Sequence, residues 1–225
     1  MNHIVLKGFI ETSFVDWPGR IASVVFLPGC SFNCGWCHNR TLIETPDRLP
    51  DIPLDDIIER IHQLADWVDG LVITGGEPTI FGALSDVVRV GRTVVPVKLD
   101  TNGSRPDVIE RLLNDGVLDG VSMDIKAPLD PVPYSRAAGV AVDVSNIQRS
   151  IRLILDAKIW CEFRTTVVPG LHAPNDIALI RRQLQELAGS PLPRPLKLQA
   201  FKPIDDLPEP WRSMKEPDLE PYLAT

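Results

Sequence analysis

Short apolar runs alternate with amphipathic segments along most of this chain, and this alternation restricts the folds open to it. Six runs read as strands, and several are nearly continuous in apolar residues, as in parallel strands covered on both faces: 21–27, 71–74, 94–100, 120–125, 159–168 and 196–201. Between them, apolar residues recur with helical spacing over 53–69, 83–90, 106–116, 145–155 and 174–188. Strands that alternate with helices in this way form a parallel sheet joined by right-handed crossovers.

The length of the chain decides between a closed and an open sheet. A closed eight-stranded barrel typically needs about 250 residues, more than the 225 present. We therefore predict an α/β fold, an open, partial (βα)6 parallel barrel, in a single domain over 1–225. Residues 1–20 are predicted to form an N-terminal lead-in, and 202–225 a C-terminal tail rich in proline and acidic residues. Residues 127–143 are predicted to form a proline-rich loop, followed by a helix that Ser145 and Gln148 cap.

Charge and composition exclude several classes of function. The net charge is −7 and the basic residues are scattered, which argues against a nucleic-acid surface. No apolar run reaches the roughly 18 residues of a membrane span, and the N-terminus lacks the pattern of a signal peptide. We expect a cytoplasmic protein without nucleic-acid or membrane partners. Clustered cysteines in such a protein indicate a metal rather than disulfides.

Three of the four cysteines lie in one loop directly after the first predicted strand. Cys30, Cys34 and Cys37 follow the spacing Cys-x3-Cys-x2-Cys, and thiolates select iron–sulfur clusters or zinc. Three thiolates on a [4Fe–4S] cluster, which usually has four, leave one iron open to a substrate. Zinc bound by the triad and His38 is the rival interpretation, although the adjacent Cys37 and His38 would struggle to reach one tetrahedral ion. The spacing favours iron–sulfur, and Cys161, in an apolar strand, is expected to be a core thiol.

The cysteine loop, followed one strand later by Gly75-Gly76-Glu77, resembles the radical S-adenosylmethionine superfamily. In that family the cysteine triad holds a [4Fe–4S] cluster, whose open iron chelates the amino and carboxylate groups of S-adenosylmethionine. The resemblance implies that Gly75, Gly76 and Glu77 hold the amino group, and an acidic acceptor beside two glycines suits an ammonium ion. Trp36, just before the last cysteine, is expected next to the adenine. Taken alone, Gly75-Gly76-Glu77 favours an ordinary turn between a strand and a helix.

The resemblance is closer still to the glycyl-radical activating enzymes, and it covers most of residues 8–203. The motifs at 100–103 and 123–126 match two motifs in the middle of that group. In the pyruvate formate-lyase activating enzyme, the equivalents of Asp100, Thr101 and Asp124 bind a monovalent cation beside the S-adenosylmethionine carboxylate, and Lys126 and Arg164 match positions that contact the cofactor. Hard oxygen atoms suit a cation, and positive side chains suit a carboxylate. Helix capping by the aspartates and a surface salt bridge of Arg164 are the alternatives.

Within that group, residues 9–13, 98–100 and 122–128 look most like the activating protein of anaerobic ribonucleoside-triphosphate reductase. The resemblance implies an oxidoreductase that cleaves S-adenosylmethionine reductively and installs a glycyl radical on that reductase. A flavodoxin- or ferredoxin-type protein would supply the electron. No catalytic residue is expected beyond the cluster and cofactor ligands, because radical transfer needs no general base.

Three other functions stay open on the residues alone. The chain could activate a different glycyl-radical enzyme, such as pyruvate formate-lyase, or perform radical chemistry on a small molecule. Outside the enzymes, a zinc-stabilised module without turnover is the alternative. Metal analysis distinguishes the last of these, because a zinc module would contain neither iron nor sulfide.

Overall fold

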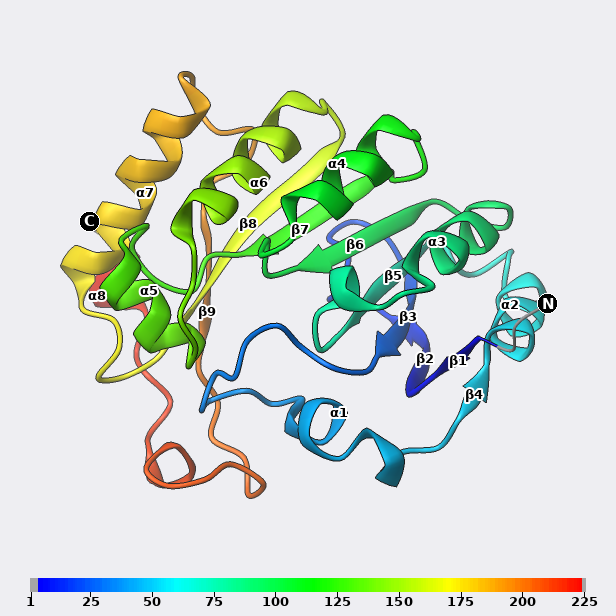
Figure 1. Ribbon diagram of the computed structural model, residues 1–225, viewed down its shortest axis with the longest axis horizontal. Coiled ribbons are helices and arrows are strands. Elements are labelled where there is room, and N and C mark those ends of the chain that lie inside the picture. Colours follow the sequence, from blue (N-terminus) through cyan, green and yellow to red (C-terminus); the bar gives the residue numbers. More distant parts are fainter. Residues whose placement is uncertain (1–3, 224–225) are drawn as a thin grey trace. The chain divides into compact units, whose positions relative to one another are not determined.

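The computed structural model describes residues 4–223, which form two compact units. Unit 1 takes residues 4–31, 39–101 and 107–121, and unit 2 takes 32–38, 102–106 and 122–223. The predicted single domain over 1–225 stays a prediction. Residues 1–3 of the predicted lead-in and 224–225 of the predicted tail lie outside the described residues. Figure 1 shows the elements in chain order.

The strands of unit 1 follow one another in the order β2, β3, β5 and β6. The antiparallel β2 precedes three mutually parallel strands. Their bounds are β2 Gly8–Ser13, β3 Ala22–Leu27, β5 Gly70–Gly75 and β6 Val97–Thr101. A separate short pair joins β1 (Val5–Leu6) to β4 (Ile52–Pro53). Both β1 and β2 lie in the predicted lead-in, whose pairing with β3 the sequence does not reveal.

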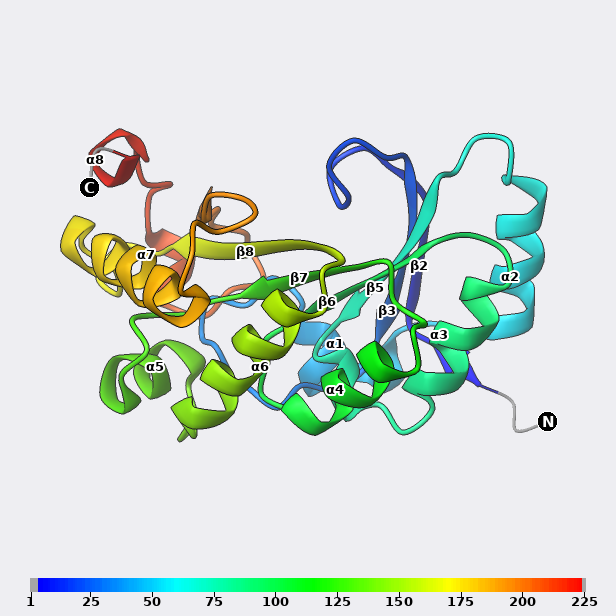
Figure 2. The same ribbon diagram turned by 90° about the horizontal axis from the view of Figure 1, so that it is seen from above.

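Helices of unit 1 cover these strands, and Figure 2 shows α2 and α3 side by side. The α2 helix buries Leu54, Ile57 and Ile61, each side chain contributing about 1.5–3 kcal/mol when fully buried. This helix was predicted to reach residue 69, but it ends at Gln63, and residues 65–67 after it are exposed rather than packed on the core. The helices are α1 Arg40–Glu44, η1 Pro46–Arg48, α2 Leu54–Gln63, η2 Pro78–Ile80, α3 Leu84–Arg92 and α4 Pro106–Asn114.

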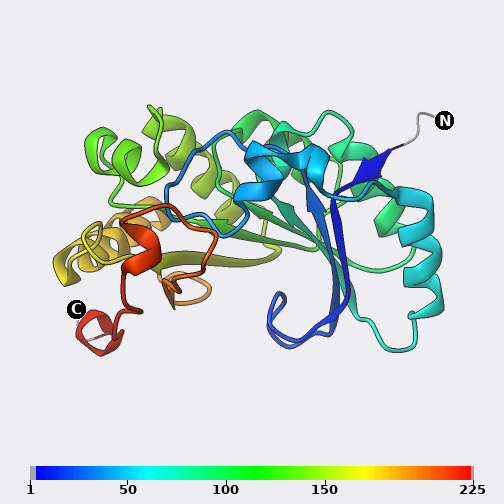
Figure 3. The ribbon, with the colours of Figure 1, turned by 90° about the horizontal axis from the view of Figure 1, so that it is seen from below.

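Unit 2 contains the parallel pair β8 and β9 and the helices that follow and precede it. Its elements are α5 Pro131–Ala138, α6 Val144–Asp156, β8 Trp160–Val167, α7 Pro174–Ala188, β9 Lys197–Ala200, η3 Trp211–Ser213 and α8 Glu220–Leu223. The tail ends in α8, which lies against α7 (Figure 3). The strand β7 (Gly120–Asp124) begins in unit 1 and ends in unit 2.

Two local predictions in this unit are wrong. Residues 127–143 do not form a plain loop, because α5 occupies their centre, with Pro131 in its first turn and Gly139 ending it in the left-handed conformation. Proline at the start and glycine just past the end are the usual signals of a helix, and they mark this one. Asp143, rather than Ser145, caps α6, because its carboxylate accepts a hydrogen bond from the Ser145 amide.

The predicted fold class is confirmed. In the described residues the larger sheet has the strand order β2-β3-β5-β6-β7-β8-β9. It begins at β2 and ends at β9, so it is an open sheet rather than a closed barrel, and its last six strands are the six predicted from the apolar runs. The strands β3 and β5 are buried along nearly their whole length, as expected of strands covered on both faces.

Across residues 4–223, none of the helices has the length and apolar content that crossing a membrane requires.

Candidate functional site

In unit 1, backbone hydrogen bonds hold the ends of β3 and β5 together beyond their paired residues. The Gly76 amide donates to the Leu27 carbonyl at 2.9 Å, and the Glu77 amide donates to the Gly29 carbonyl at 2.8 Å. The residue directly before Cys30 is therefore fixed to the turn that carries the predicted amino-group ligands. Loop and turn behave as one piece of structure because their main chains are paired.

This close approach explains the glycine pair. Gly75 has φ +132°, and the Asn39 side-chain amide donates to its carbonyl at 2.8 Å. A Cβ on Gly76 would lie 1.8 Å from the Gly29 carbonyl oxygen and 3.4 Å from the Cβ of Cys30. A Cβ on Gly75 would lie 2.2 Å from the Leu27 carbonyl oxygen. A larger residue at Gly75 would therefore displace the end of β3, and one at Gly76 would displace the cysteine loop. That both glycines also hold the S-adenosylmethionine amino group stays a prediction.

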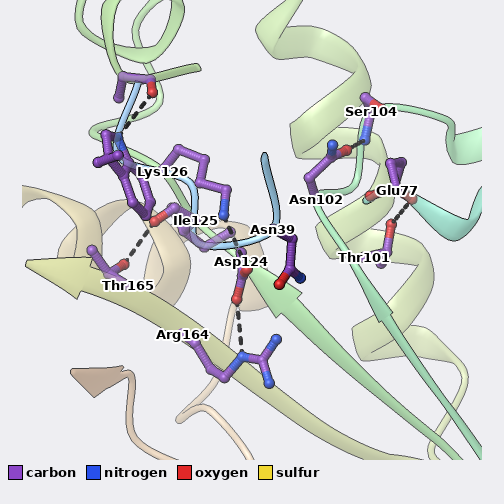
Figure 4. Close-up of polar contacts among 12 residues, drawn as sticks. Asn39, Glu77, Thr101, Asn102, Ser104, Asp124, Ile125, Lys126, Arg164 and Thr165 are labelled. Atoms are coloured by element: carbon purple, nitrogen blue, oxygen red, sulfur yellow. Dashed lines mark hydrogen bonds and ion pairs between the residues drawn. The ribbon is translucent and has the colours of Figure 1, made fainter. Parts of the chain in front are cut away.

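Glu77 is buried, with 1% of its surface exposed, and its carboxylate is anchored by threonines. Its Oε1 accepts a hydrogen bond from the Thr101 hydroxyl at 2.7 Å (Figure 4). The same oxygen accepts a second one from the amide of Thr79 at 3.1 Å. The Thr79 hydroxyl donates to the same oxygen. These contacts fix the carboxylate at the start of η2, and they join two predicted cofactor ligands, Glu77 and Thr101, which come from different strand ends.

Asp100 forms an ion pair with Lys98, two residues earlier on the same strand. Lys98 is fully buried, and Asp100 is 7% exposed. Residues two apart project from the same face of a strand, whereas Thr101 projects from the other face of β6. In the sequence, Lys98 is one residue of the motif at 98–100, and the motif alone does not predict that it pairs with a proposed cation ligand.

In unit 2, Asp124 at the end of β7 accepts from two positive side chains (Figure 4). Its Oδ1 lies 2.9 Å from Nε of Arg164, and its Oδ2 lies 3.0 Å from Nζ of Lys126. The three residues were predicted at the carboxylate end of the cofactor, and the structure brings them together. The cluster carries a net positive charge, as a binding site for a carboxylate requires.

The electrostatics of this cluster favour its ionised state. Burial alone would raise the pKa of Asp124, but Arg164 and Lys126 together lower it below its ordinary value. Burial would lower the pKa of Lys126, yet the negative charges of Asp124 and of a Cys34 thiolate raise it above its ordinary value. Lys126 is thus held positive close to one of the predicted cluster ligands.

The C-terminal end of α5 holds the second half of the cysteine loop. The Asn33 amide donates to the Ala138 carbonyl at 2.8 Å, and Nε1 of Trp36 donates to the Ala137 carbonyl at 3.3 Å. The Trp36 side chain is buried, and Nζ of Lys126 lies 5.1 Å from its ring centroid, a cation–π contact. Its predicted contact with adenine stays a prediction.

Tyr134, on α5, is a residue that the sequence reasoning missed. It is fully buried, and within the described part of the chain its hydroxyl has no hydrogen-bond partner. Burial raises the pKa of this hydroxyl, and the main chain and the positive charge of Lys126 offset part of that rise. A buried hydroxyl without a partner is costly, and a bound group that offers an acceptor atom would satisfy it. No motif marks it, because it lies in the stretch predicted as a loop.

From the sequence, His172 follows Pro169-Gly170 and is expected to be a solvated loop residue, with a position facing the nucleoside as the alternative; the expected solvated state is wrong. It is 4% exposed: its Nδ1 accepts from the Val168 amide at 3.0 Å, and Nε2 lies 2.8 Å from the Lys126 carbonyl. Burial lowers the pKa of the imidazole, which favours the neutral ring that these two hydrogen bonds need. His172 therefore positions the main chain of Lys126.

The four cysteines are thiols, and they differ in burial. Cys161 and Cys34 are buried, whereas Cys30 and Cys37 are partly exposed. Burial raises the pKa of Cys161, as expected of the predicted core thiol. Within residues 4–223, no three His, Cys, Asp or Glu side chains are grouped at metal-binding distances, so the triad's role as ligands stays a prediction. The donor set fits the group: soft thiolates, a nearby ammonium and an unsatisfied hydroxyl suit an anionic cluster with sulfur acceptors.

Comparison with known proteins assigns the chain to a family. The profile of the Radical SAM superfamily matches residues 24–178. A protein of Methanocaldococcus jannaschii, provisionally named a glycyl-radical enzyme activating enzyme, is 30% identical over 219 residues, which cover 95% of this chain and 86% of the relative. The pyruvate formate-lyase-activating enzyme of Streptococcus mutans is 37% identical over 70 residues, 29% of this chain and 26% of that enzyme.

A solved structure agrees with the fold. The radical SAM enzyme coproporphyrinogen III oxidase from Escherichia coli superposes with a TM-score of 0.59 at 16% identity, covering 93% of this chain and 51% of that one. The chain belongs to the radical S-adenosylmethionine superfamily, whose members use a [4Fe–4S] cluster and S-adenosylmethionine. Within it, the chain is homologous to the glycyl-radical enzyme activating enzymes.

Proposed function

We propose that this protein is an activating enzyme that installs a glycyl radical on a larger partner, anaerobic ribonucleoside-triphosphate reductase. The observation that carries the proposal is homology over 95% of the chain to a relative named for glycyl-radical enzyme activation. The choice of partner rests on the motifs at 9–13, 98–100 and 122–128, which resemble those of the reductase activating protein. A flavodoxin- or ferredoxin-type protein is the proposed electron donor.

Cys30, Cys34 and Cys37 are the proposed ligands of the cluster. A [4Fe–4S] cluster held by these thiolates would supply the electron for reductive cleavage of S-adenosylmethionine, the radical chemistry that would remove a hydrogen atom from a glycine of the partner. Lys126, held positive beside Cys34, favours the thiolate that a metal needs. The partner-free hydroxyl of Tyr134 can donate to an acceptor there.

The other proposed ligands bind and orient S-adenosylmethionine. Glu77, fixed by its threonines, is an acceptor for the amino group, with Gly75 and Gly76 shaping the turn beside it. Lys126 and Arg164, preorganised on Asp124, are donors for the carboxylate. Side chains already held in place lose little entropy on binding, so they orient the cofactor effectively.

Trp36 and the tail help to exclude water in unit 2. The Trp36 side chain is buried next to Lys126, and Trp211 of the tail packs against Gly35, whose added Cβ would lie 2.5 Å from its Nε1. His38 also contacts the tail, through the Lys202 carbonyl at 2.7 Å. A covered loop protects reactive intermediates from solvent.

Electron spin resonance with purified partners tests the proposal. Reconstituted protein, reductant and S-adenosylmethionine are mixed without oxygen with anaerobic ribonucleoside-triphosphate reductase or, separately, with pyruvate formate-lyase. We expect a glycyl-radical signal on the reductase and none on the formate-lyase. The reverse result would favour the second candidate, an activase of a formate-lyase-type enzyme, which the 37% identity over 70 residues supports.

A further inference from the structure

The three residues expected to bind a monovalent cation each have a partner within their own unit. In unit 1, Asp100 is ion-paired with Lys98, and the Thr101 hydroxyl donates to Glu77. In unit 2, both carboxylate oxygens of Asp124 accept from positive side chains. The negative charges of both aspartates are therefore already compensated, and the neutral Thr101 hydroxyl, which keeps its lone pairs, does not attract a cation by charge. Such a donor set fits an additional cation poorly, because cations bind oxygens whose charge is not already compensated.

The ammonium group of Lys98 compensates the negative charge of Asp100. A fully buried ammonium ion persists only when it is paired and hydrogen-bonded, and Asp100 supplies that pairing on the same face of β6. Asp100 lies nearer the carboxyl end of the strand, where the site is expected, and Lys98 lies one pleat deeper. The positive charge thus reaches the aspartate from the interior of unit 1.

We propose that the ammonium group of Lys98 takes the position of the monovalent cation at Asp100, so that this protein binds S-adenosylmethionine without potassium or sodium. Lys98 is a positioning residue, since it acts through Asp100. The inference rests on the proposed function insofar as it concerns S-adenosylmethionine. The absence of a cation at Asp100 follows from the Lys98–Asp100 ion pair alone and does not depend on the proposed function.

The main test measures binding of S-adenosylmethionine to the reconstituted full chain by equilibrium dialysis, in potassium chloride and in tetramethylammonium chloride of equal ionic strength. For the wild type we expect dissociation constants within twofold of each other. Lys98→Met keeps most of the side-chain volume and removes the ammonium, leaving space for one small cation beside Asp100. For this variant we expect at least about tenfold weaker binding without potassium, and recovery when potassium is added.

A second readout follows the cation without S-adenosylmethionine. A ligand that binds only the folded state raises the melting temperature. Potassium at tenfold its dissociation constant should raise the melting temperature of Lys98→Met by about 3 °C. The melting temperature of the wild type should not change. The matched control is Lys197→Met, which removes a partly exposed lysine paired with Glu162 at 3.4 Å and should stay insensitive to potassium in both assays.

The outcomes separate the two proposals. A wild type that needs potassium or sodium to bind S-adenosylmethionine, or that melts higher in potassium, overturns the role of Lys98. So does a folded Lys98→Met that shows no response to potassium. If Lys98→Met does not fold, the double variant Lys98→Met/Asp100→Asn replaces it, because that variant removes both charges. We expect the double variant to fold and its melting temperature not to change with potassium. A rise in its melting temperature with potassium overturns the inference. No binding of S-adenosylmethionine under any salt contradicts the proposed function instead, while the melting experiment still tests the ion pair.

Discussion

At the scale of single residues, the charged groups predicted at the cofactor meet partners within their own unit. Asp100 pairs with Lys98, and Asp124 pairs with Lys126 and Arg164. Such pairing costs desolvation energy that the attraction between the charges offsets, and loss of one partner leaves the other charge uncompensated, which is destabilising. Side chains of this kind are preorganised before any ligand arrives.

The cysteines give the sharpest prediction at this scale. Cys34→Ala should abolish iron and sulfide binding, because two thiolates do not hold a [4Fe–4S] cluster of this type. Cys161→Ala removes a buried thiol from β8 and should keep full cluster content, at a stability cost of about 1 kcal/mol. Iron and sulfide analysis after anaerobic reconstitution checks both variants. Loss of the cluster in Cys161→Ala would show that the ligand assignment is wrong.

The Asp124 cluster predicts how stability depends on pH. The pKa of Asp124 lies below its ordinary value of 3.8, so its ionised form stabilises the fold above that value, and the effect is lost as pH falls through the lowered pKa. The pKa of Lys126 lies above its ordinary 10.5, so its contribution is present below that value and is lost only at higher pH. Asp124→Asn should therefore cost about 1–3 kcal/mol of unfolding free energy, with no change between about pH 5 and 9.

Urea unfolding of both proteins across that range measures the difference. Below about pH 4 the wild type should lose its advantage over Asp124→Asn as the carboxylate becomes protonated. If the difference in unfolding free energy between the two proteins changed across neutral pH, a group other than Asp124 would determine the charge of the cluster.

At the scale of elements, α5 supports the cysteine loop. Its last carbonyls accept hydrogen bonds from Asn33 and Trp36, and its final residue is followed by Gly139 at φ +71°. An added Cβ on Gly139 would lie 2.0 Å from the Asn33 carbonyl oxygen. A short helix outside the sheet thus determines the position of the loop that includes Cys34.

Gly139→Ala tests this support against a matched glycine. Gly189 also ends a helix of unit 2 in the left-handed conformation, at φ +61°, but has no atom within 4 Å of an added Cβ. Both alanine variants bear the backbone strain of about 1 kcal/mol or more, and only Gly139→Ala displaces the cysteine loop. We expect Gly139→Ala to lose most of its reconstituted cluster and Gly189→Ala to retain it, as measured by iron content. Equal cluster content in the two variants would refute the support by α5.

The sequence predicts the regular part of the fold and misses what depends on distant contacts. The apolar runs predict six strands of the sheet, and β3 and β5, whose runs are nearly continuous, are buried along nearly their whole length. The α5 helix was missed because its prolines read as a loop, although Pro131 and Gly139 are the signals that mark it. The buried state of His172 was missed because it comes from pairing with Lys126, 46 residues away. Sequence spacing contains no information on such a contact.

At the scale of the whole chain, the predicted motifs lie at the carboxyl ends of successive strands. Cys30 follows β3, the glycine pair follows β5, and Asp100 and Thr101 end β6 in unit 1. Asp124 ends β7 and Arg164 lies in β8 of unit 2. Parallel α/β folds build their ligand sites at these ends. Such a fold can change its chemistry at the strand ends while the apolar strands stay the same, which fits 16% identity to an enzyme that shares the fold.

Cleavage of S-adenosylmethionine tests the central claim most directly. The reconstituted full chain is reduced with dithionite under argon and given S-adenosylmethionine, and 5′-deoxyadenosine and methionine are quantified by chromatography. We predict that both appear in equal amounts with the wild type and that neither appears with Cys34→Ala. If wild-type protein loaded with iron and sulfide releases no 5′-deoxyadenosine, the proposal of radical chemistry is contradicted.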